Sequence, residues 1–308
     1  MPLDLSVKLG PLELSSPLMT ASGCSGYGKE LDRYHDLSVY GALVGKSISR
    51  NPRLGNPYPR TAETAAGMIN AIGLQNEGFD AFVKNTLPKM RSFGPKAIVN
   101  IVGHDFDEYV WLTERFDNEE GVAALELNLS CPNVAGGMQF ATDAGQCEQL
   151  VKACRAKTRL PIIAKLSPNV TDIAKIARAA EAGGADILCA INTLVGMAVD
   201  WRKRTPLVAN VTGGLSGPAI KPVALRCVWQ AARAVKIPVI AIGGISNADD
   251  VLEFMVAGAS AVQLGTILFV EPDAGQTIHN GLKQRLLDAG IQRISDLVGT
   301  LQTGAPSA

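Results

Sequence analysis

Eight short apolar segments, each followed by a helix-like segment, predict an α/β fold for this 308-residue chain: a closed (β/α)8 TIM barrel. The strands are expected at 18–21, 42–46, 97–102, 123–129, 162–166, 187–191, 239–242 and 261–264. Repeated strand-then-helix units imply parallel strands joined by right-handed crossovers, and eight such strands close into a barrel. An open, doubly wound sheet is the alternative architecture.

The first element is a hairpin over 7–14, with Gly10-Pro11 at its turn. Among the crossovers, three helices are clearest: 172–182, 219–235 and 249–257. For the first of these, Thr171 is the expected N-cap, and Gly183-Gly184 is expected to end the helix. The whole chain, 1–308, is expected to form one barrel domain, because α/β barrels commonly reach this length without dividing.

Two connections are too long to be simple barrel loops. One runs over 47–60, contains three prolines and leads on to 70–78, and the other covers 192–217. Long loops after barrel strands commonly build the active site. These two connections are therefore expected to cover the mouth of the barrel.

The composition excludes several classes of function. Lys and Arg total 29, as do Asp and Glu, so the zero formal charge gives no sign of a nucleic-acid partner. Six scattered cysteines without a C-x-x-C pair, and only three histidines, argue against a metal or iron–sulfur site in this chain. No signal-like or membrane-spanning segment is found, so we expect a protein of the reducing cytoplasm.

Polar residues or glycines stand where nearly every predicted strand ends. In a barrel, the carboxyl ends of the strands carry the active site. The residues expected there are Ser22, Lys46, Ser47, Asn100, Asn128, Lys165, Asn192, Thr193, Gly243, Gly244, Gly265 and Thr266.

The last two strands end in glycine corners. Gly243-Gly244 and Gly265-Thr266 follow strands seven and eight, where glycine lets backbone N–H groups approach an anion closely. This is the usual phosphate site of such barrels, and plain tight turns are the alternative interpretation.

Two lysines, Lys46 and Lys165, each end an apolar strand. A lysine drawn into the barrel mouth needs an anionic partner, such as a substrate carboxylate or an electron-rich cofactor edge. Two alternatives remain open at this point. Either side chain could extend to solvent, or Lys165 could form the Schiff base of an aldolase.

The run 126–133, Glu-Leu-Asn-Leu-Ser-Cys-Pro-Asn, is the most informative stretch of the chain. It delivers two amides, Asn128 and Asn133, and one thiol, Cys131, to one end of one strand. Amides supply both donors and acceptors, which suits a flat heterocycle with alternating C=O and N–H groups. A thiol between them can act as a nucleophile or a proton acceptor. The cysteines at 147, 154, 189 and 227 are expected to be buried apolar residues, and the role of Cys24 stays open.

These motifs resemble those of class 1 dihydroorotate dehydrogenases over essentially the whole chain, most closely class 1B. The most specific motifs are residues 128–133 and the run 70–76, Asn-Ala-Ile-Gly-Leu-Gln-Asn. Supporting pieces are Thr20-Ala-Ser-Gly23, Lys46-Ser47, Asn192-Thr193 and the two glycine corners. The resemblance implies oxidation of dihydroorotate to orotate in de novo pyrimidine (UMP) biosynthesis.

The same resemblance implies a chemistry. FMN would lie across the barrel mouth with dihydroorotate stacked on it. Cys131 would be the general base that removes the C5 proton, while hydride passes from C6 to flavin N5. A free thiol has a pKa near 8.5, so its pKa must be lowered or it must act partly ionised.

The remaining site residues follow from the family pattern. The expected FMN-binding residues are Ser22, Lys46, Ser47, Asn100, Asn128, Lys165, Ile191, Gly217, Gly243, Gly244, Gly265 and Thr266. The expected substrate-binding residues are Lys46, Asn70, Ala71, Ile72, Gly73, Leu74, Asn128, Asn133, Asn192 and Thr193. Lys165 would face the N1/O2 edge of the flavin, and Lys46 the orotate carboxylate. No metal is expected.

Class 1B enzymes work with a second subunit that carries FAD and a [2Fe–2S] cluster and passes electrons to NAD⁺. The resemblance therefore implies a homodimer joined by this electron-transfer subunit in a heterotetramer. Two alternatives stay open: a dihydropyrimidine dehydrogenase-type flavoenzyme, or a class 1A-like, fumarate-dependent enzyme without the partner.

Overall fold

The computed structural model describes residues 3–129 and 140–304. Its centre is a closed barrel of eight strands that follow one another around the ring in chain order. They are β3 (Leu18–Thr20), β4 (Ala42–Val44), β7 (Lys96–Ile101), β8 (Val122–Asn128), β9 (Ile162–Leu166), β10 (Ile187–Ala190), β15 (Val239–Ile242) and β16 (Ala259–Leu264). All neighbouring pairs are parallel. The predicted barrel and its eight strands are confirmed.

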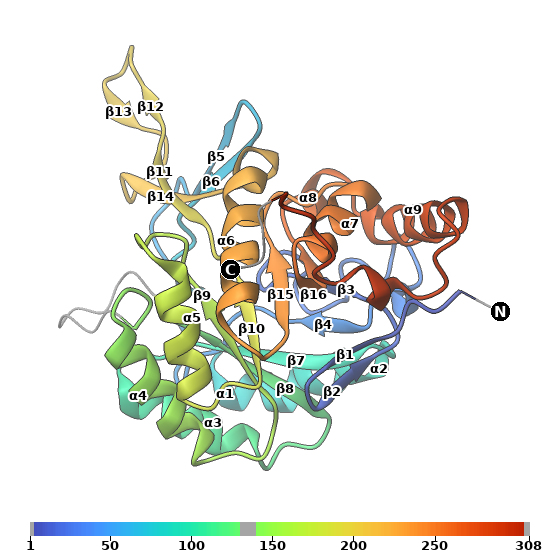
Figure 1. Cartoon of the computed structure of the whole chain (residues 1–308). Coiled ribbons are helices and arrows are strands. Elements are labelled where there is room, and N and C mark those ends of the chain that lie inside the picture. The colour runs from blue at the N-terminus through green and yellow to red at the C-terminus, as the bar shows by residue number, and fades with distance from the viewer. Residues whose placement is uncertain (1–2, 130–139, 305–308) are drawn as a thin grey trace.

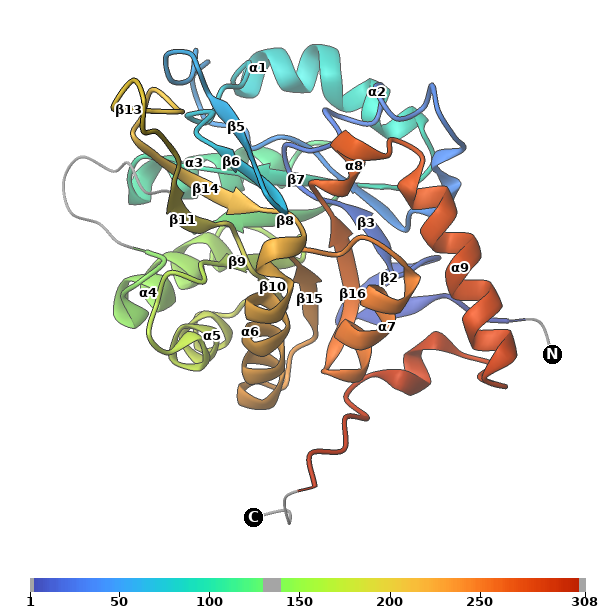
Figure 2. The same ribbon diagram turned by 90° about the horizontal axis from the view of Figure 1, so that it is seen from above.

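Helices form a ring around the barrel, as Figure 2 shows. The α-helices are α1 (Phe79–Ala81), α2 (Leu87–Ser92), α3 (Phe106–Phe116), α4 (Ala144–Arg155), α5 (Ile173–Ala182), α6 (Lys221–Ala234), α7 (Ala248–Val256), α8 (Ile267–Val270) and α9 (Ala274–Asp288). Short η segments lie at Leu37–Val39, Phe82–Thr86, Pro218–Ile220 and Ile294–Leu297. Their apolar faces pack on strands that are buried almost throughout, because a barrel strand faces the lumen on one side and helices on the other.

Two details of the predicted helices are corrected. Asp172, not Thr171, caps α5, because its carboxylate accepts hydrogen bonds from the amides of Ala174 and Lys175. The helix expected over 219–235 is divided into an η turn and α6, with Pro222 in the first turn of α6, where a missing N–H costs little. Gly183 ends α5 as expected.

The predicted amino-terminal hairpin is present as β1 (Val7–Leu9) and β2 (Leu12–Leu14). Its leucines are buried, and Gly10 at its turn adopts a φ of 57°. A Cβ on Gly10 would lie 3.4 Å from the carbonyl oxygen of Asp186, just before β10. The hairpin therefore covers the amino ends of the barrel strands and leaves the carboxyl ends for the site.

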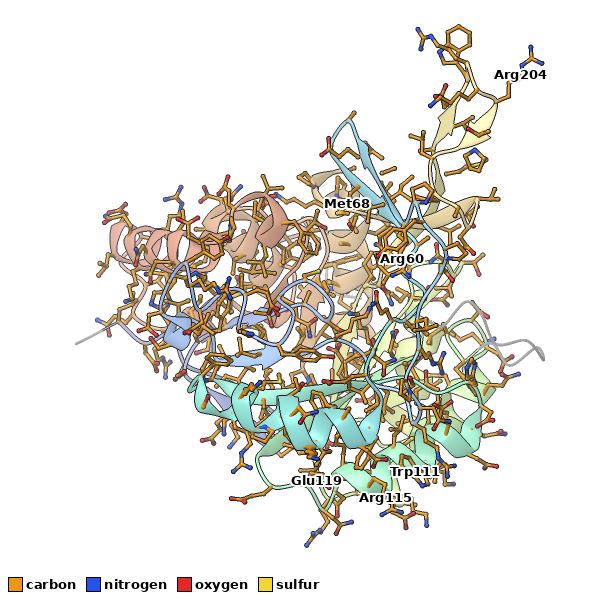
Figure 3. The ribbon with its side chains drawn as sticks, turned by 180° about the vertical axis from the view of Figure 1, so that it is seen from behind. Arg60, Met68, Trp111, Arg115, Glu119 and Arg204 are labelled. Carbon is orange, nitrogen blue, oxygen red and sulfur yellow. The ribbon has the colours of Figure 1, made fainter. Side chains whose placement is uncertain are left out.

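The two long connections join in one antiparallel sheet at the carboxyl ends, with strand order β11-β14-β6-β5. It consists of β5 (Thr61–Thr64), β6 (Gly67–Asn70), β11 (Leu194–Met197) and β14 (Thr212–Ser216), and we call it the loop sheet. From it an arm, β12 (Val199–Asp200) and β13 (Thr205–Pro206), projects beyond the barrel (Figure 1). Arg204 marks the tip of this arm in Figure 3.

Across residues 3–129 and 140–304, no helix is long and apolar enough to cross a bilayer. Within the same ranges, no group of three or more His, Cys, Asp or Glu side chains is arranged to hold a metal ion.

Candidate functional site

Neighbouring barrel strands align the polar residues of the mouth. Asn100 of β7 is paired in register with Glu126 of β8, and Asn128 of β8 is paired with Lys165 of β9. Because strand side chains alternate, Glu126 and Asn128 point to the same side of β8. Both are buried, with 0% and 9% of their surfaces exposed. The parallel register therefore brings predicted site residues from three strands together.

A buried carboxylate lies at the base of this group. Glu126 accepts a hydrogen bond from Nδ2 of Asn100 at 2.6 Å and another from Nε2 of Gln263 at 2.5 Å. Nζ of Lys165 lies 3.7 Å from its Oε1. Gln263 belongs to β16, which lies across the barrel from β8. We call these four residues the mouth cluster.

The mouth cluster determines the state of Lys165. Burial is the largest influence and disfavours a charged amine, but the charge and hydrogen bond of Glu126, with further contributions from Cys189 and Cys24, together raise the pKa of Lys165 above its usual value. A Schiff-base lysine needs a free amine, which requires a lowered pKa. The pairing with Glu126 therefore argues against the aldolase alternative and favours a fixed positive charge.

Lys46 is held differently. Its side chain packs on Gly23, where a Cβ would lie 3.2 Å from Cδ of Lys46. Burial lowers the pKa of Lys46, the nearby Cys24 opposes that shift, and the charge of Lys165 adds to it. Among the described residues, no carboxylate lies within 4 Å of its ammonium. A half-buried ammonium of this kind suits an anionic ligand.

Three predicted polar residues form a chain of contacts over the mouth. Nδ2 of Asn192 donates to Oδ1 of Asn128 at 3.2 Å, and Nδ2 of Asn128 approaches Oγ of Ser47 at 3.5 Å. The hydroxyl of Tyr109 donates to the carbonyl oxygen of Asn128 at 2.5 Å and anchors the strand end. Strand-end residues from β4, β8 and β10 therefore meet, as predicted.

The loop sheet brings in two more predicted residues. Nδ2 of Asn70 donates to the carbonyl oxygen of Gly214 at 3.3 Å. A Cβ on Gly214 would overlap the hydroxyl of Thr193, so Thr193 packs directly on that glycine. The pairing of β6 with β14 thus joins the loop after β4 to the loop after β10.

The segment 70–74, expected to bind substrate, is fastened to the loop before it. Arg60 donates to the carbonyl oxygens of Asn56 and Leu54 and to Oε1 of Gln75, at 2.5, 2.9 and 2.6 Å. Nδ2 of Asn56 donates to the carbonyl oxygen of Ala71 at 3.0 Å. Arg60 lies on the barrel side of the loop sheet in Figure 3. Ile72, Gly73 and Leu74 are half-buried within this fastened segment.

The predicted phosphate corner has the required backbone. Gly243 and Gly244 adopt φ values of 130° and 77°, which only glycine adopts readily. Gly217 has a φ of 95°, and a Cβ there would lie 2.6 Å from Cα of Gly67. The hydroxyl of Thr266 donates to Oγ of Ser216 at 2.8 Å. The corner is therefore tied to the loop sheet, and Gly265 packs beside Cys24.

Other predicted residues are placed less decisively. Ile191 is buried after β10, and its amide donates to the carbonyl oxygen of Ile242. Ser22 is half-buried after β3. Cys131 and Asn133 lie outside the described residues. The cysteines at 147, 154, 189 and 227 are buried, as expected.

Sequence reasoning missed two residues of the mouth cluster, Glu126 and Gln263. Both interrupt apolar strands, and Glu126 stands two positions before Asn128, on the same face of its strand. A charged residue inside a barrel strand needs a buried partner, and this signal would have indicated both residues.

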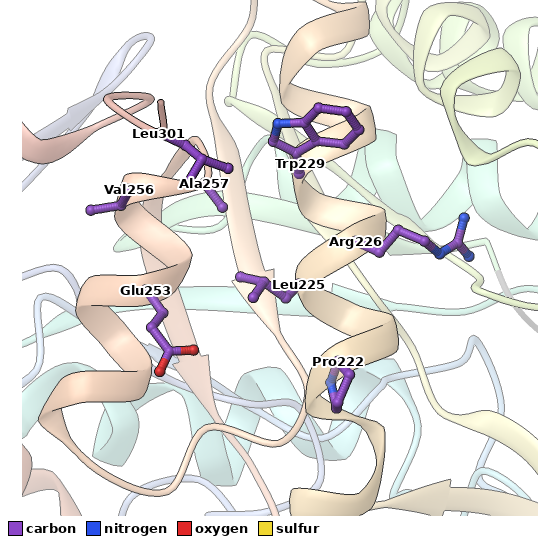
Figure 4. A pocket seen from close by; sticks show the side chains of 8 residues that line it. All are labelled: Pro222, Leu225, Arg226, Trp229, Glu253, Val256, Ala257 and Leu301. Carbon is purple, nitrogen blue, oxygen red and sulfur yellow. The ribbon is translucent and has the colours of Figure 1, made fainter. Parts of the chain in front are cut away.

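A separate groove lies on the outer wall of the barrel, with a volume of about 440 Å³. Figure 4 shows Leu225 and Trp229 of α6 facing Val256 and Ala257, with Leu301 closing one end. Its lining includes none of the predicted site residues. The site at the mouth is distinct from this groove.

Comparison with known proteins identifies the family of the chain. The dihydroorotate dehydrogenase family model matches residues 4–286. A relative from Trichlorobacter lovleyi, named dihydroorotate dehydrogenase B (NAD(+)), catalytic subunit, is 57% identical over 299 residues, which are 97% of this chain and 98% of the relative. A protein of the same name from Pelobacter propionicus is 54% identical over 300 residues, 97% and 99% of the two chains.

The fold has a matching solved structure. The crystal structure of DHODH from Eimeria tenella in complex with ferulenol superposes with a TM-score of 0.80 at 23% identity, over 97% of this chain and 91% of that one. At this identity the likeness supports the barrel alone. The family model and the relatives above 50% identity extend over nearly the whole chain and confirm the predicted family. The chain belongs to the dihydroorotate dehydrogenase family, with class 1B catalytic subunits as its near relatives.

Proposed function

We propose that this chain oxidises dihydroorotate to orotate with bound FMN, as the catalytic subunit of a class 1B enzyme. The observation that carries the proposal is the convergence of Lys46, Asn128, Lys165 and Asn192 at the carboxyl ends of one barrel, in a chain more than half identical to proteins named for this activity. Dihydroorotate carries a carboxylate for a lysine, and ring C=O and N–H groups for amides.

The described residues fit FMN. Oδ1 of Asn100 is buried and has no hydrogen-bond partner among the described residues, so this oxygen can accept a hydrogen bond from a ligand. The positive φ values of Gly217, Gly243 and Gly244 form tight glycine turns after β14 and β15, where we place the phosphate. Lys165 supplies a fixed charge for an electron-rich ring edge. When bound, FMN would supply the hydride acceptor.

This chain would contribute orientation and proton transfer. Asn70, Asn128, Asn133 and Asn192 would hold the pyrimidine by hydrogen bonds that a ring of different pattern would leave unmade. Lys46 would bind the carboxylate, with the backbone of 71–74 beside it. Cys131, three residues after Asn128, would take the proton from C5. Its thiol must ionise at least partly for this.

The name of the relatives supports an electron path beyond FMN. Their name includes NAD(+) and a catalytic subunit, which implies a second subunit. We propose that this subunit carries FAD and a [2Fe–2S] cluster, and that it joins a homodimer of this chain in a heterotetramer in the cytoplasm. Reduction of FMN by dihydroorotate would then occur in this chain alone, and reduction of NAD⁺ only in the complex.

An anaerobic visible spectrum of the purified chain tests the proposal. The flavin band should bleach on addition of dihydroorotate and stay unchanged with dihydrouracil, because only dihydroorotate has a carboxylate for Lys46. Bleaching by dihydrouracil would favour the dihydropyrimidine dehydrogenase-type alternative. Reoxidation by fumarate, without a partner, would favour a class 1A-like enzyme. A chain that cannot be loaded with FMN would overturn the proposal.

A further inference from the structure

Glu126 is the one acidic residue among the inward-facing side chains of the mouth cluster, and the proposed mechanism has given it no role. It is fully buried and contacts side chains from three other strands. It accepts hydrogen bonds from Asn100 of β7 and Gln263 of β16, and it pairs with the ammonium of Lys165 of β9. A buried carboxylate is costly unless it is paired and hydrogen-bonded. A carboxylate at the base of a site is expected to set the orientation and the protonation state of the residues that contact it.

The first partner is an amide whose orientation Glu126 decides. A carboxylate only accepts hydrogen bonds, so the side of Asn100 that faces Glu126 at 2.6 Å must be its NH₂ group. Its Oδ1 is thereby turned away from Glu126. It is buried and lacks a hydrogen-bond partner among the described residues. Asn100 therefore offers an acceptor to a ligand, and without Glu126 the amide could turn and offer a donor.

Gln263 repeats this arrangement from across the barrel. Its Nε2 donates to the second oxygen of Glu126, while its Oε1 also lacks a hydrogen-bond partner among the described residues. Both carboxylate oxygens are therefore engaged from opposite sides of the lumen. This fixes the position of the carboxylate below the mouth.

The second consequence concerns charge. Among the described residues, Lys165 interacts electrostatically with four ionisable groups: Glu126, Cys189, Cys24 and Lys46. Burial raises the pKa of both thiols, which keeps them neutral, and Lys46 is a second cation. Among the described residues, Glu126 is the only carboxylate within 4 Å of the Lys165 ammonium. Without Glu126, burial and Lys46 would both favour the neutral amine.

We propose that Glu126 is the positioning residue of the flavin site, which keeps Lys165 as an ammonium and turns Asn100 so that its carbonyl oxygen faces the cofactor. The inference rests on the proposed function, because it assumes a flavin over the mouth. Glu126 would act through Lys165 and Asn100, without itself touching cofactor or substrate. A merely structural carboxylate would support folding and leave the electronic properties of the flavin unchanged.

Sulfite titration of the FMN-loaded chain separates these roles without any turnover. Sulfite adds to flavin N5 and places negative charge on the ring, so its affinity reports positive charge near the N1/O2 edge. In Glu126→Gln, which keeps the shape of the side chain, the dissociation constant for sulfite should rise by about fivefold or more. Relative to wild type at the same pH, the loss should grow with rising pH as Lys165 deprotonates, and Lys165→Met should show no such pH dependence.

The matched control is Asp186→Asn. It removes a different ion pair, between Asp186 and Arg155 at 2.8 Å. This pair is only partly buried and lies at the amino ends of the strands, away from the mouth. Its sulfite affinity should equal that of wild type. If Glu126→Gln does not fold, Glu126→Asp gives the same test, because one methylene fewer withdraws the charge from Lys165 and sulfite affinity should still fall.

The outcomes are separable. A wild-type chain that binds no FMN overturns the proposed function. A wild type that binds FMN, with a Glu126→Gln variant whose sulfite affinity changes less than about fivefold or becomes tighter, overturns only the role of Glu126. The same conclusion follows if Glu126→Asp matches wild type, or if Asp186→Asn weakens sulfite binding as much as Glu126→Gln does.

Discussion

The mouth cluster and the loop sheet face the same site but are built in opposite ways. The mouth cluster consists of fully or nearly fully buried side chains on barrel strands, whose positions follow from the parallel register. The loop sheet consists of half-exposed residues from two loops, joined by β6 and β14. The difference teaches that the proposed cofactor side of the site is part of the core, whereas the proposed substrate side includes a sheet added outside the core.

The largest effect is expected from removal of the proposed general base. Cys131→Ala should bind FMN normally but reduce it with dihydroorotate about 10²–10⁴ times more slowly, the range for loss of a general base. Stopped-flow bleaching of the flavin band measures this rate. Cys227→Ala removes a buried thiol of α6, remote from the mouth, and should react at the wild-type rate. A Cys131→Ala variant with wild-type kinetics would show that another group is the base.

The second prediction tests whether the mouth cluster belongs to the core. Lys165→Met leaves the Glu126 carboxylate buried without its counterion, which should lower the free energy of unfolding by about 3–5 kcal/mol. Urea unfolding of the flavin-free chain measures the loss. The double variant Glu126→Gln/Lys165→Met should be more stable than the sum of the single changes predicts. Additive losses would mean that the two residues are not coupled.

Part of the difference between the mouth cluster and the loop sheet could be predicted from the sequence. The strands, the glycine corners and the amides at strand ends follow from local periodicity and turn chemistry, so the barrel and most of the mouth could be predicted. Glu126 was missed although it interrupts an apolar strand, because its partners Asn100, Lys165 and Gln263 come from three other strands, up to 137 residues away. The loop sheet was missed for the same reason: two long loops were recognised, but nothing local to either indicates that β6 pairs with β14.

The third prediction concerns the loop sheet. Asn70→Ala should leave FMN binding unchanged and lower kcat/KM for dihydroorotate by roughly 10- to 100-fold, because the loss of one hydrogen-bonding group from a formed site costs about 1–3 kcal/mol. Steady-state kinetics of the complex with its partner measure it. Asn118→Ala, at the exposed end of α3, is the control and should be neutral. Loss of FMN from Asn70→Ala would contradict the division between the two regions.

The smallest effect is expected from Arg60, which would support the substrate-binding segment without itself contacting substrate. Arg60→Lys loses part of the three hydrogen bonds that fasten the segment 70–74, so KM should rise roughly two- to tenfold with kcat nearly unchanged. Arg204→Lys at the tip of the arm is the matched control (Figure 3). An equal effect of both changes on KM would show that the hydrogen bonds of Arg60 do not support the segment 70–74.

The hydrogen bond from Asn70 to Gly214 joins residues 144 positions apart. Contacts of such separation form slowly, because a long stretch of chain must be ordered before the two ends can meet. During synthesis, the segment around Asn70 leaves the ribosome well before its partner strand exists. When β14 emerges, six of the eight barrel strands have already been made, and only β15 and β16, which close the barrel against β3, are still to come. The newly made chain can therefore complete its loop sheet and its barrel wall at nearly the same stage, so neither the proposed substrate pocket nor the barrel is finished long before the other.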